Sequence, residues 1–186
     1  MIVETPRIAF EDLPAPLQDR LRPRVARLGY LGAFFQVAAH QPDALAGFVD
    51  FTEALKHALA PRLVEVVALT VAVATGNAYE RVQHERLALT VGLDHDEVRA
   101  LVDGAAPAER FDAVERAAFA LAREVVAAGG RSCARSYAPL EALAGPSIAV
   151  GCLMMATRHL AHATMANTWG LIAPVSSPLQ EEAGRV

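Results

Sequence analysis

The chain consists of apolar stretches with helical spacing, separated by short breaks at proline and glycine. Apolar residues between Pro42 and Pro61 recur three or four positions apart, which predicts a helix. Residues 77–91 begin with a capping asparagine and end before Gly92, which favours the left-handed conformation at a helix end. Similar signals predict three more helices, over 94–102 with an Asp94–Glu97 capping box, over 108–128 and over 146–167.

The first forty residues are predicted to form an N-terminal arm. Its apolar segment Leu31–His40 is expected to pack on the rest of the molecule. We predict a single domain over residues 1–186, with a family core at about 42–103. Three prolines are expected to break the first thirty residues of the arm into short pieces: Pro14, Pro16 and Pro23.

Residues 62–75 are ambiguous in their secondary structure. They carry no charge after Glu65 and are rich in valine. A continuous apolar run of this length fits a buried helix or a buried parallel strand, and periodicity does not separate the two.

Composition indicates an ordered protein with a substantial core. Of the 186 residues, 53% are hydrophobic and 20% are charged, and the mean hydropathy is +0.26. The formal net charge is -4 and basic residues are scattered, so we expect no nucleic-acid partner.

The sequence gives no reason to expect a membrane or export. The N-terminal sequence has no basic region followed by an apolar run and a cleavage site, so a cytoplasmic location is expected. The apolar stretches over 66–76 and 142–157 are shorter than the roughly 18 residues of a spanning helix. Residues 159–180 are interrupted by histidines, asparagine and prolines, so we predict no membrane partner.

Glu65 is the first candidate for chemistry, because a buried carboxylate is costly unless it is paired or protonated. On the following predicted helix, one stripe carries Asn77, Glu80, His84 and Val91. If that stripe faces Glu65, two carboxylates and an imidazole meet in one pocket and can exchange protons near neutral pH. The alternatives are a surface Glu80–His84 pair and a Glu65 that only caps a neighbouring helix.

The stretch PRLVEVVALTVAVATGNAYERVQHERLALTVGLDHDEVRAL resembles the core of the carboxymuconolactone decarboxylase and alkylhydroperoxidase D superfamily. That signature is a glutamate, a CxxC after eleven residues, and a histidine after three more. Glu65 stands at the glutamate, Asn77 and Glu80 at the two cysteines, and His84 at the histidine. Tyr79 with Glu80 and His84 is similar to the YExxxH variant of branches that lack the cysteines.

The resemblance implies an all-α fold, an alkylhydroperoxidase D-like helical bundle, and so a helix over residues 62–75. It also implies self-association, as a homotrimer, a homohexamer or a dimer. The thiol peroxidase mechanism of the family needs a nucleophilic and a resolving cysteine, and neither cysteine position here holds one.

The remaining groups predict an acid–base enzyme for decarboxylation, enolisation or lactone isomerisation of a small organic acid or lactone. We expect Glu65, Glu80 and His84 to be catalytic, with His84 as the main acid and base. Substrate contacts are predicted for three neighbours of these residues: Asn77, Tyr79 and Arg81. No metal and no organic cofactor are expected.

Two alternatives remain for the function. One is alkylhydroperoxidase-like antioxidant activity through Cys133, whose neighbours Arg131 and Arg135 would favour a thiolate. The other is a non-catalytic oligomeric binding protein. If Glu65 is unpaired, Glu65→Gln should stabilise such a scaffold but disable an enzyme.

Residues near the C-terminus add further candidates. His159 and His162 lie three positions apart, which suits a metal pair, but spacing indicates no third ligand, so a core or interface role is favoured. Arg158, like Arg81, is a candidate to bind a substrate carboxylate. Cys152 is expected to be a small core residue.

Overall fold

The computed structural model describes residues 4–106 and 109–183, and every regular element within those ranges is a helix. The all-α fold class predicted from the sequence is therefore confirmed. In chain order the elements are η1 (Phe10–Asp12), α1 (Ala15–Leu28), α2 (Ala33–Ala38), α3 (Pro42–Ala58), α4 (Pro61–Ala74), α5 (Ala78–Thr90), α6 (His95–Val102), α7 (Ala113–Ala128), α8 (Ala134–Thr168) and α9 (Pro178–Ala183).

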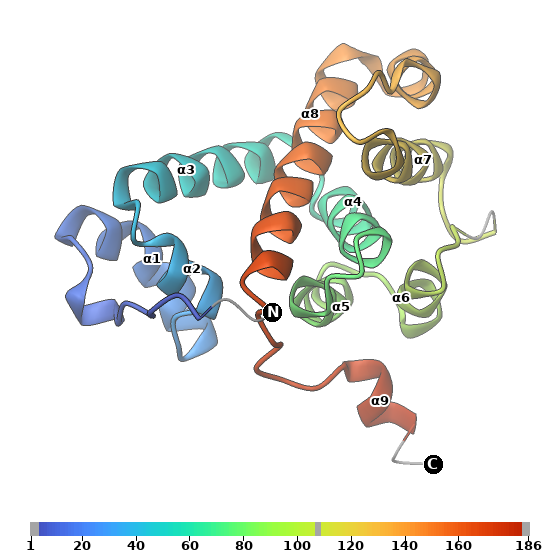
Figure 1. Ribbon diagram of the computed structural model, residues 1–186. Helices are drawn as coiled ribbons and strands as arrows, with labels where there is room; N and C mark the ends of the chain where they lie inside the picture. Colours follow the sequence, from blue (N-terminus) through green and yellow to red (C-terminus); the bar gives the residue numbers. More distant parts are fainter. Residues whose placement is uncertain (1–3, 107–108, 184–186) are drawn as a thin grey trace.

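Helix α8 runs through the middle of the molecule (Figure 1). In that view α1, α2 and α3 lie on one side of it, and α5, α6 and α7 lie on the other. Helices α3, α4 and α7 all contact α8, and α4 also contacts α5, α6 and α7. The site described below lies where α1, α3, α5 and α8 meet.

Helix α4 is the most deeply buried element. Every residue from Leu63 to Ala72 is buried, so the segment has no solvent-facing side. This explains why its sequence shows no helical periodicity, because periodicity arises from a polar face that α4 lacks. Each fully buried valine or leucine stabilises the fold by about 1.5–3 kcal/mol. The same burial places Glu65 in the core.

The predicted ends of α5 and α6 are observed. Asn77 caps α5 by accepting a hydrogen bond from the backbone N–H of Glu80 at 2.9 Å, and Gly92 follows that helix with φ of 95°. Asp94 and Glu97 form the reciprocal capping box of α6.

Arg62 connects three helices at the base of α4. Its guanidinium donates to Glu97 and to Glu115 at 2.5 Å each, and to the carbonyl of Gly92 at 2.7 Å. Glu97 and Glu115 are also the glutamates of the α6 and α7 capping boxes. One arginine therefore fixes the starts of α6 and α7 relative to α4.

Pro23 does not break the arm, because it lies inside α1. Proline removes one backbone donor and is costly in a helix interior. Here the helix continues because Leu17 and Leu21 on its other face are buried in the core.

The predicted start of the 108–128 helix is wrong. Ala108 lies outside the described residues, and α7 begins at Ala113. Its start is set by Asp112, which accepts from the backbone N–H of Glu115 at 2.8 Å. The sequence contains this second capping box, but the prediction did not use it.

Helix α8 contains a helical segment that was not predicted. Residues 134–144 are helical, and Gly145 interrupts the helix with φ of 80° and ψ of 167°. The second segment starts at Pro146, as predicted, because proline suits the first turn of a helix. By length and composition α8 is the one helix of the described chain that could cross a membrane, with 33% of its apolar window buried. Core helices meet the same criterion, and this one carries Arg158, His159 and His162 in the interior.

Candidate active site

Glu65 and His84 form a buried pair between α4 and α5. Nδ1 of His84 lies 2.6 Å from Oε2 of Glu65. This contact fixes the orientation of the imidazole ring. The other ring nitrogen, Nε2, points toward Glu80 and lies 3.7 Å from its Oε1. The sequence placed Glu80 and His84 on one stripe of a helix that was expected to meet Glu65 only if it faced that residue, and the structure brings all three together.

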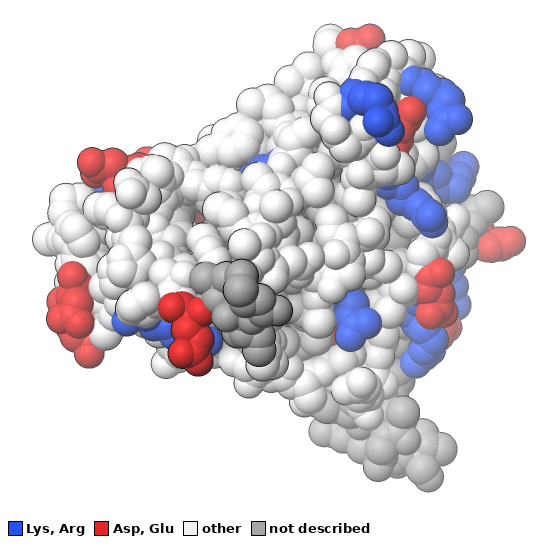
Figure 2. All heavy atoms as spheres, in the orientation of Figure 1, with Lys and Arg blue, Asp and Glu red and all other residues white. Residues whose placement is uncertain are grey.

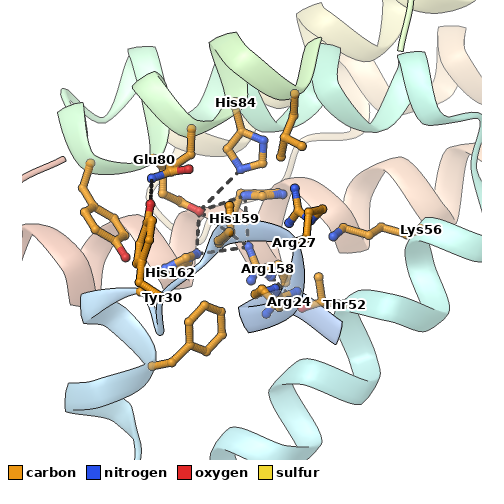
Figure 3. Close-up of a pocket in the computed structure, with 16 residues that line it drawn as sticks. Arg24, Arg27, Tyr30, Thr52, Lys56, Glu80, His84, Arg158, His159 and His162 are labelled. Atoms are coloured by element: carbon orange, nitrogen blue, oxygen red, sulfur yellow. Dashed lines mark hydrogen bonds and ion pairs between the residues drawn. The ribbon is translucent and has the colours of Figure 1, made fainter. Parts of the chain in front are cut away.

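Glu80 also joins α5 to α8. Its Oε1 lies 2.5 Å from Nδ1 of His162, 3.4 Å from Nδ1 of His159 and 3.7 Å from Nη1 of Arg158. In Figure 3 the dashed lines from these side chains meet at the Glu80 carboxylate. The two histidine-containing segments of the sequence thus form one cluster.

The protonation states in this cluster follow from burial and pairing. Burial opposes the charge on His84, but the charges and hydrogen bonds of Glu65 and Glu80 outweigh it and raise the pKa of His84 to about 9. Burial lowers the pKa of His159 to about 3 and that of His162 to about 4. Of the three imidazoles, His84 therefore holds its proton most tightly.

Glu80 and Arg158 are oppositely charged. Burial opposes ionisation of Glu80, but the neighbouring His162 and His159 lower its pKa well below the usual range. Burial lowers the pKa of Arg158 to about 10, which still leaves the guanidinium charged at neutral pH. Its Nε donates to Oγ1 of Thr52 at 2.8 Å, and its guanidinium lies 4.6 Å from the centre of the Phe48 ring.

The cluster forms one wall of a cavity of about 90 Å³. Figure 3 shows Glu80 and His84 on one side of this cavity and Arg24, Arg27 and Lys56 on the other. The polar and charged residues that line it come from α1 and the segment after it, from α3, from α5 and from α8: Arg24, Arg27, Tyr30, Thr52, Lys56, Tyr79, Glu80, Gln83, His84, Arg158, His159 and His162.

The three predicted substrate contacts lie in different surroundings. Tyr79 lines the cavity, and its hydroxyl accepts a hydrogen bond from the backbone N–H of Phe34 at 3.3 Å. Asn77 is buried outside the cavity lining, where it caps α5 and donates to the carbonyl of Ala163 at 3.2 Å. Arg81 also lies outside the lining and pairs with Glu85 at 3.3 Å.

Several cavity residues were not identified from the sequence. Arg24 and Arg27 lie in the N-terminal arm, and Thr52 and Lys56 lie on α3. No local motif marks them, because they reach the site only through tertiary packing. Arg158 was identified as a carboxylate-binding candidate, and the structure places it on the cavity wall.

The structure brings further potential metal ligands close to His159, which the sequence spacing of His159 and His162 did not indicate. Ligand atoms of Glu80, His84 and His159 lie within 4.8 Å of one another. However, Nη1 of Arg158 lies 3.1 Å from Nδ1 of His159 and 3.2 Å from Nδ1 of His162. The guanidinium therefore faces the Nδ1 atoms, whereas Nε2 of His159, Nε2 of His162 and Oε2 of Glu80 are buried without a hydrogen-bond partner among the described residues.

The two cysteines lie outside the cavity lining and are free thiols. Cys133 lines a different cavity at the start of α8, and partial burial together with Glu124 raises its pKa. Arg135, which was expected to favour a thiolate there, lies 3.5 Å from Glu124 instead. Cys152 is fully buried, and burial raises its pKa to about 11.

Fold and site together define an all-helical protein with an alkylhydroperoxidase D-like bundle. The sequence profile of the Carboxymuconolactone decarboxylase family matches residues 42–124. A solved structure of the alkylhydroperoxidase AhpD core, an uncharacterized peroxidase-related protein from Ralstonia eutropha, has a TM-score of 0.77 at 18% identity, covering 93% of both chains. The family match over residues 42–124 and the shared fold support the superfamily resemblance noted in the sequence.

A second structural neighbour is a cysteine-to-alanine variant of the debrominase Bmp8, solved in complex with 2,3,4-tribromopyrrole. Its TM-score is 0.79 at 14% identity, covering 100% of this chain and 98% of the other. At these identities both structures establish the shared fold. A search of curated proteins found no matching sequence.

Proposed function

We propose that this protein is an acid–base enzyme that acts on a small organic acid or lactone. The observation that supports this most strongly is the buried Glu65–His84 pair at 2.6 Å, with the histidine on the wall of a cavity. A paired carboxylate both orients the imidazole and holds its proton. His84 is then a proton donor on the cavity wall, with Nε2 as the nitrogen that Glu65 does not hold.

The proposed reaction is decarboxylation or enolisation beside a carbonyl group. In a decarboxylation the C–C bond to the carboxylate breaks, CO₂ leaves, and the electron pair forms an enolate. His84 donates its Nε2 proton to the enolate and then regains a proton from solvent. In an enolisation without loss of CO₂, the neutral form of His84 removes the proton from carbon first.

Arg158 and Glu80 have separate roles in this proposal. The buried guanidinium of Arg158 stabilises the negative charge that develops on the enolate oxygen, because a fixed cation in a buried site needs no reorganisation. Glu80 maintains the charge of His84 and positions His162. Glu65 holds the imidazole ring in one orientation.

The test is exchange of substrate protons with solvent. Small oxo acids and lactones are incubated with the protein in D₂O, and deuterium incorporation or loss of CO₂ is followed by NMR. We expect turnover by the native protein and its loss in His84→Gln. A control variant, His57→Gln, changes a histidine outside the cavity lining and should retain turnover. Equal turnover in His84→Gln would contradict the proposal.

A thiol peroxidase function through Cys133 is the second candidate, and the raised pKa of that thiol argues against it. Reductant-dependent consumption of an organic hydroperoxide separates the two functions. We expect no consumption by the native protein or by a Cys133→Ser/Cys152→Ser variant. Consumption that is lost in the serine variant would establish the peroxidase function instead.

The exposed face of α8 supports the proposal that the protein forms a homo-oligomer. Leu143, Val150 and Met154 are exposed large apolar residues on this helix. Figure 2 shows a wide area with few charged side chains over the middle of the molecule, where α8 lies in Figure 1. Light scattering with size-exclusion chromatography should give a dimer, trimer or hexamer, and Val150→Asp should reduce its mass. A monomer in the native protein would contradict this proposal.

A further inference from the structure

Three cationic side chains stand where two cavities meet. Arg24 and Arg27 of α1 and Lys56 of α3 line the 90 Å³ cavity beside His84. The same three residues, with Leu87, also line a larger cavity of about 520 Å³, whose wall includes the carboxylates of Glu53 and Glu65 as well. We call Arg24, Arg27 and Lys56 the cationic rim, since a molecule that extends from one cavity to the other must pass them.

The cationic rim has more positive charge than its protein partners neutralise. Nη2 of Arg24 lies 2.8 Å from Oε1 of Glu53, and Nζ of Lys56 lies 3.4 Å from the same oxygen. Arg27 makes no hydrogen bond or ion pair with any residue that the structure describes. Glu53 thus pairs with two of the three cations, and Arg27 has no carboxylate partner among the described residues.

These cations also repel one another. Burial lowers the pKa of Arg24 and Glu53 opposes that shift, while the nearby charge of Arg27 lowers the pKa further. Burial likewise lowers the pKa of Lys56, while Glu53 and Glu65 raise it and Arg24 and Arg158 lower it. Clustered like charges destabilise a fold, and a bound anion relieves that cost.

We propose that the cationic rim is a binding subsite for an oxyanion group of the substrate, remote from the carbon that reacts at His84. Arg27 is the residue that determines this specificity, because it lines both cavities and its guanidinium has no protein carboxylate of its own. The small inner cavity holds the reacting end of the molecule, and the larger cavity holds the charged tail. The ligand class is therefore an organic acid with a second anionic group at the far end.

This inference rests on the proposed function for the position of the reacting carbon, but the subsite is tested by binding alone. Adipate and hexanoate have the same number of carbons and differ by one terminal carboxylate. Their affinities for the full chain are measured by isothermal titration calorimetry, with a phosphonate analogue of adipate as a third probe. We expect adipate to bind about tenfold more tightly than hexanoate, because the second carboxylate gains charge-assisted hydrogen bonds.

Single substitutions test whether the cationic rim causes the difference in affinity between adipate and hexanoate. Arg27→Gln should abolish the preference for adipate, and it should fold normally because Arg27 is exposed. The control Arg22→Gln removes an exposed arginine of the same helix that lines neither cavity, so the preference should remain. The preference should also persist in His84→Gln, which separates binding at the rim from turnover. Preference for the phosphonate over adipate would assign the tail to a phosphate-type group.

Two results would overturn the proposal. One is equal affinity for adipate and hexanoate, with no gain for the phosphonate. The other is an unchanged preference in Arg27→Gln, which would place the second anion elsewhere.

Discussion

Glu65 and His84 meet in the core, with Nδ1 of the imidazole 2.6 Å from Oε2 of the carboxylate. The contact joins α4 to α5 and connects a helix without a solvent-facing side to the wall of the cavity. Because Glu65 has a partner, its burial alone no longer argues for catalysis. The pairing also reverses the expected effect of Glu65→Gln on stability, because the earlier expectation assumed an unpaired carboxylate.

Glu65→Gln should destabilise the protein at neutral pH. The amide leaves the His84 imidazolium without its nearest counter-charge, and we expect a loss of about 2 kcal/mol, since the histidine can relieve part of the cost by releasing its proton. Urea unfolding measures the change, with the exposed Glu141→Gln as a control that should stay within about 0.5 kcal/mol. Greater stability of Glu65→Gln would show that the pair does not stabilise the fold.

The raised pKa of His84 makes stability depend on pH. The folded protein retains the His84 proton up to about pH 9, whereas an unfolded chain releases it near 6.5. This contribution is complete below pH 6.5 and is lost as the pH rises to about 9, and its size is on the order of 3 kcal/mol. The difference in unfolding free energy between the native protein and His84→Gln should shrink over that range. A constant difference would contradict the assignment.

Arg62→Met should destabilise the fold without affecting the cavity. The substitution leaves Glu97 and Glu115 as largely buried carboxylates without their shared cation, at a cost of about 2–3 kcal/mol. Arg22→Met removes an exposed pair and should change unfolding free energy by less than about 0.5 kcal/mol. A similarly small effect of Arg62→Met in urea unfolding would show that the three-helix contact contributes little.

Removal of metal ions should leave the protein unchanged. Arg158 contacts Nδ1 of both His159 and His162, so a divalent cation near these histidines would sit beside a buried guanidinium and be repelled by it. We therefore expect the same melting temperature after dialysis against a chelator and after addition of Zn²⁺. A stabilisation by Zn²⁺ that disappears in His159→Ala would show that the cluster is a metal site.

The sequence predicted much of α5 and its role, because its signals are local. Asn77 and Gly92 mark its ends, and the four-residue spacing of Glu80 and His84 places both side chains on one face. Glu65 lies on another helix, α4, and the spacing of the superfamily signature linked it to Glu80 and His84. Stripe geometry and spacing together therefore identified the three residues that the structure brings together.

The rest of the cavity depends on packing that no local pattern records. Arg27 reaches the site from an arm predicted to be fragmented, and its helix persists because buried leucines hold it against α3. Thr52 bonds to Arg158 across 106 positions of sequence. His159 and His162 lacked a visible third ligand because Glu80 lies on a different helix.

The pKa of His84 is the quantity that most directly tests the proposed acid–base site, and it needs no known substrate. NMR titration of the six histidines, with His84→Gln to assign the resonance, gives the value. We predict about 9 in the native protein and a clear fall in Glu65→Gln. A value at or below 6.5 in the native protein would contradict the account, because Glu65 and Glu80 would then not hold a proton on His84.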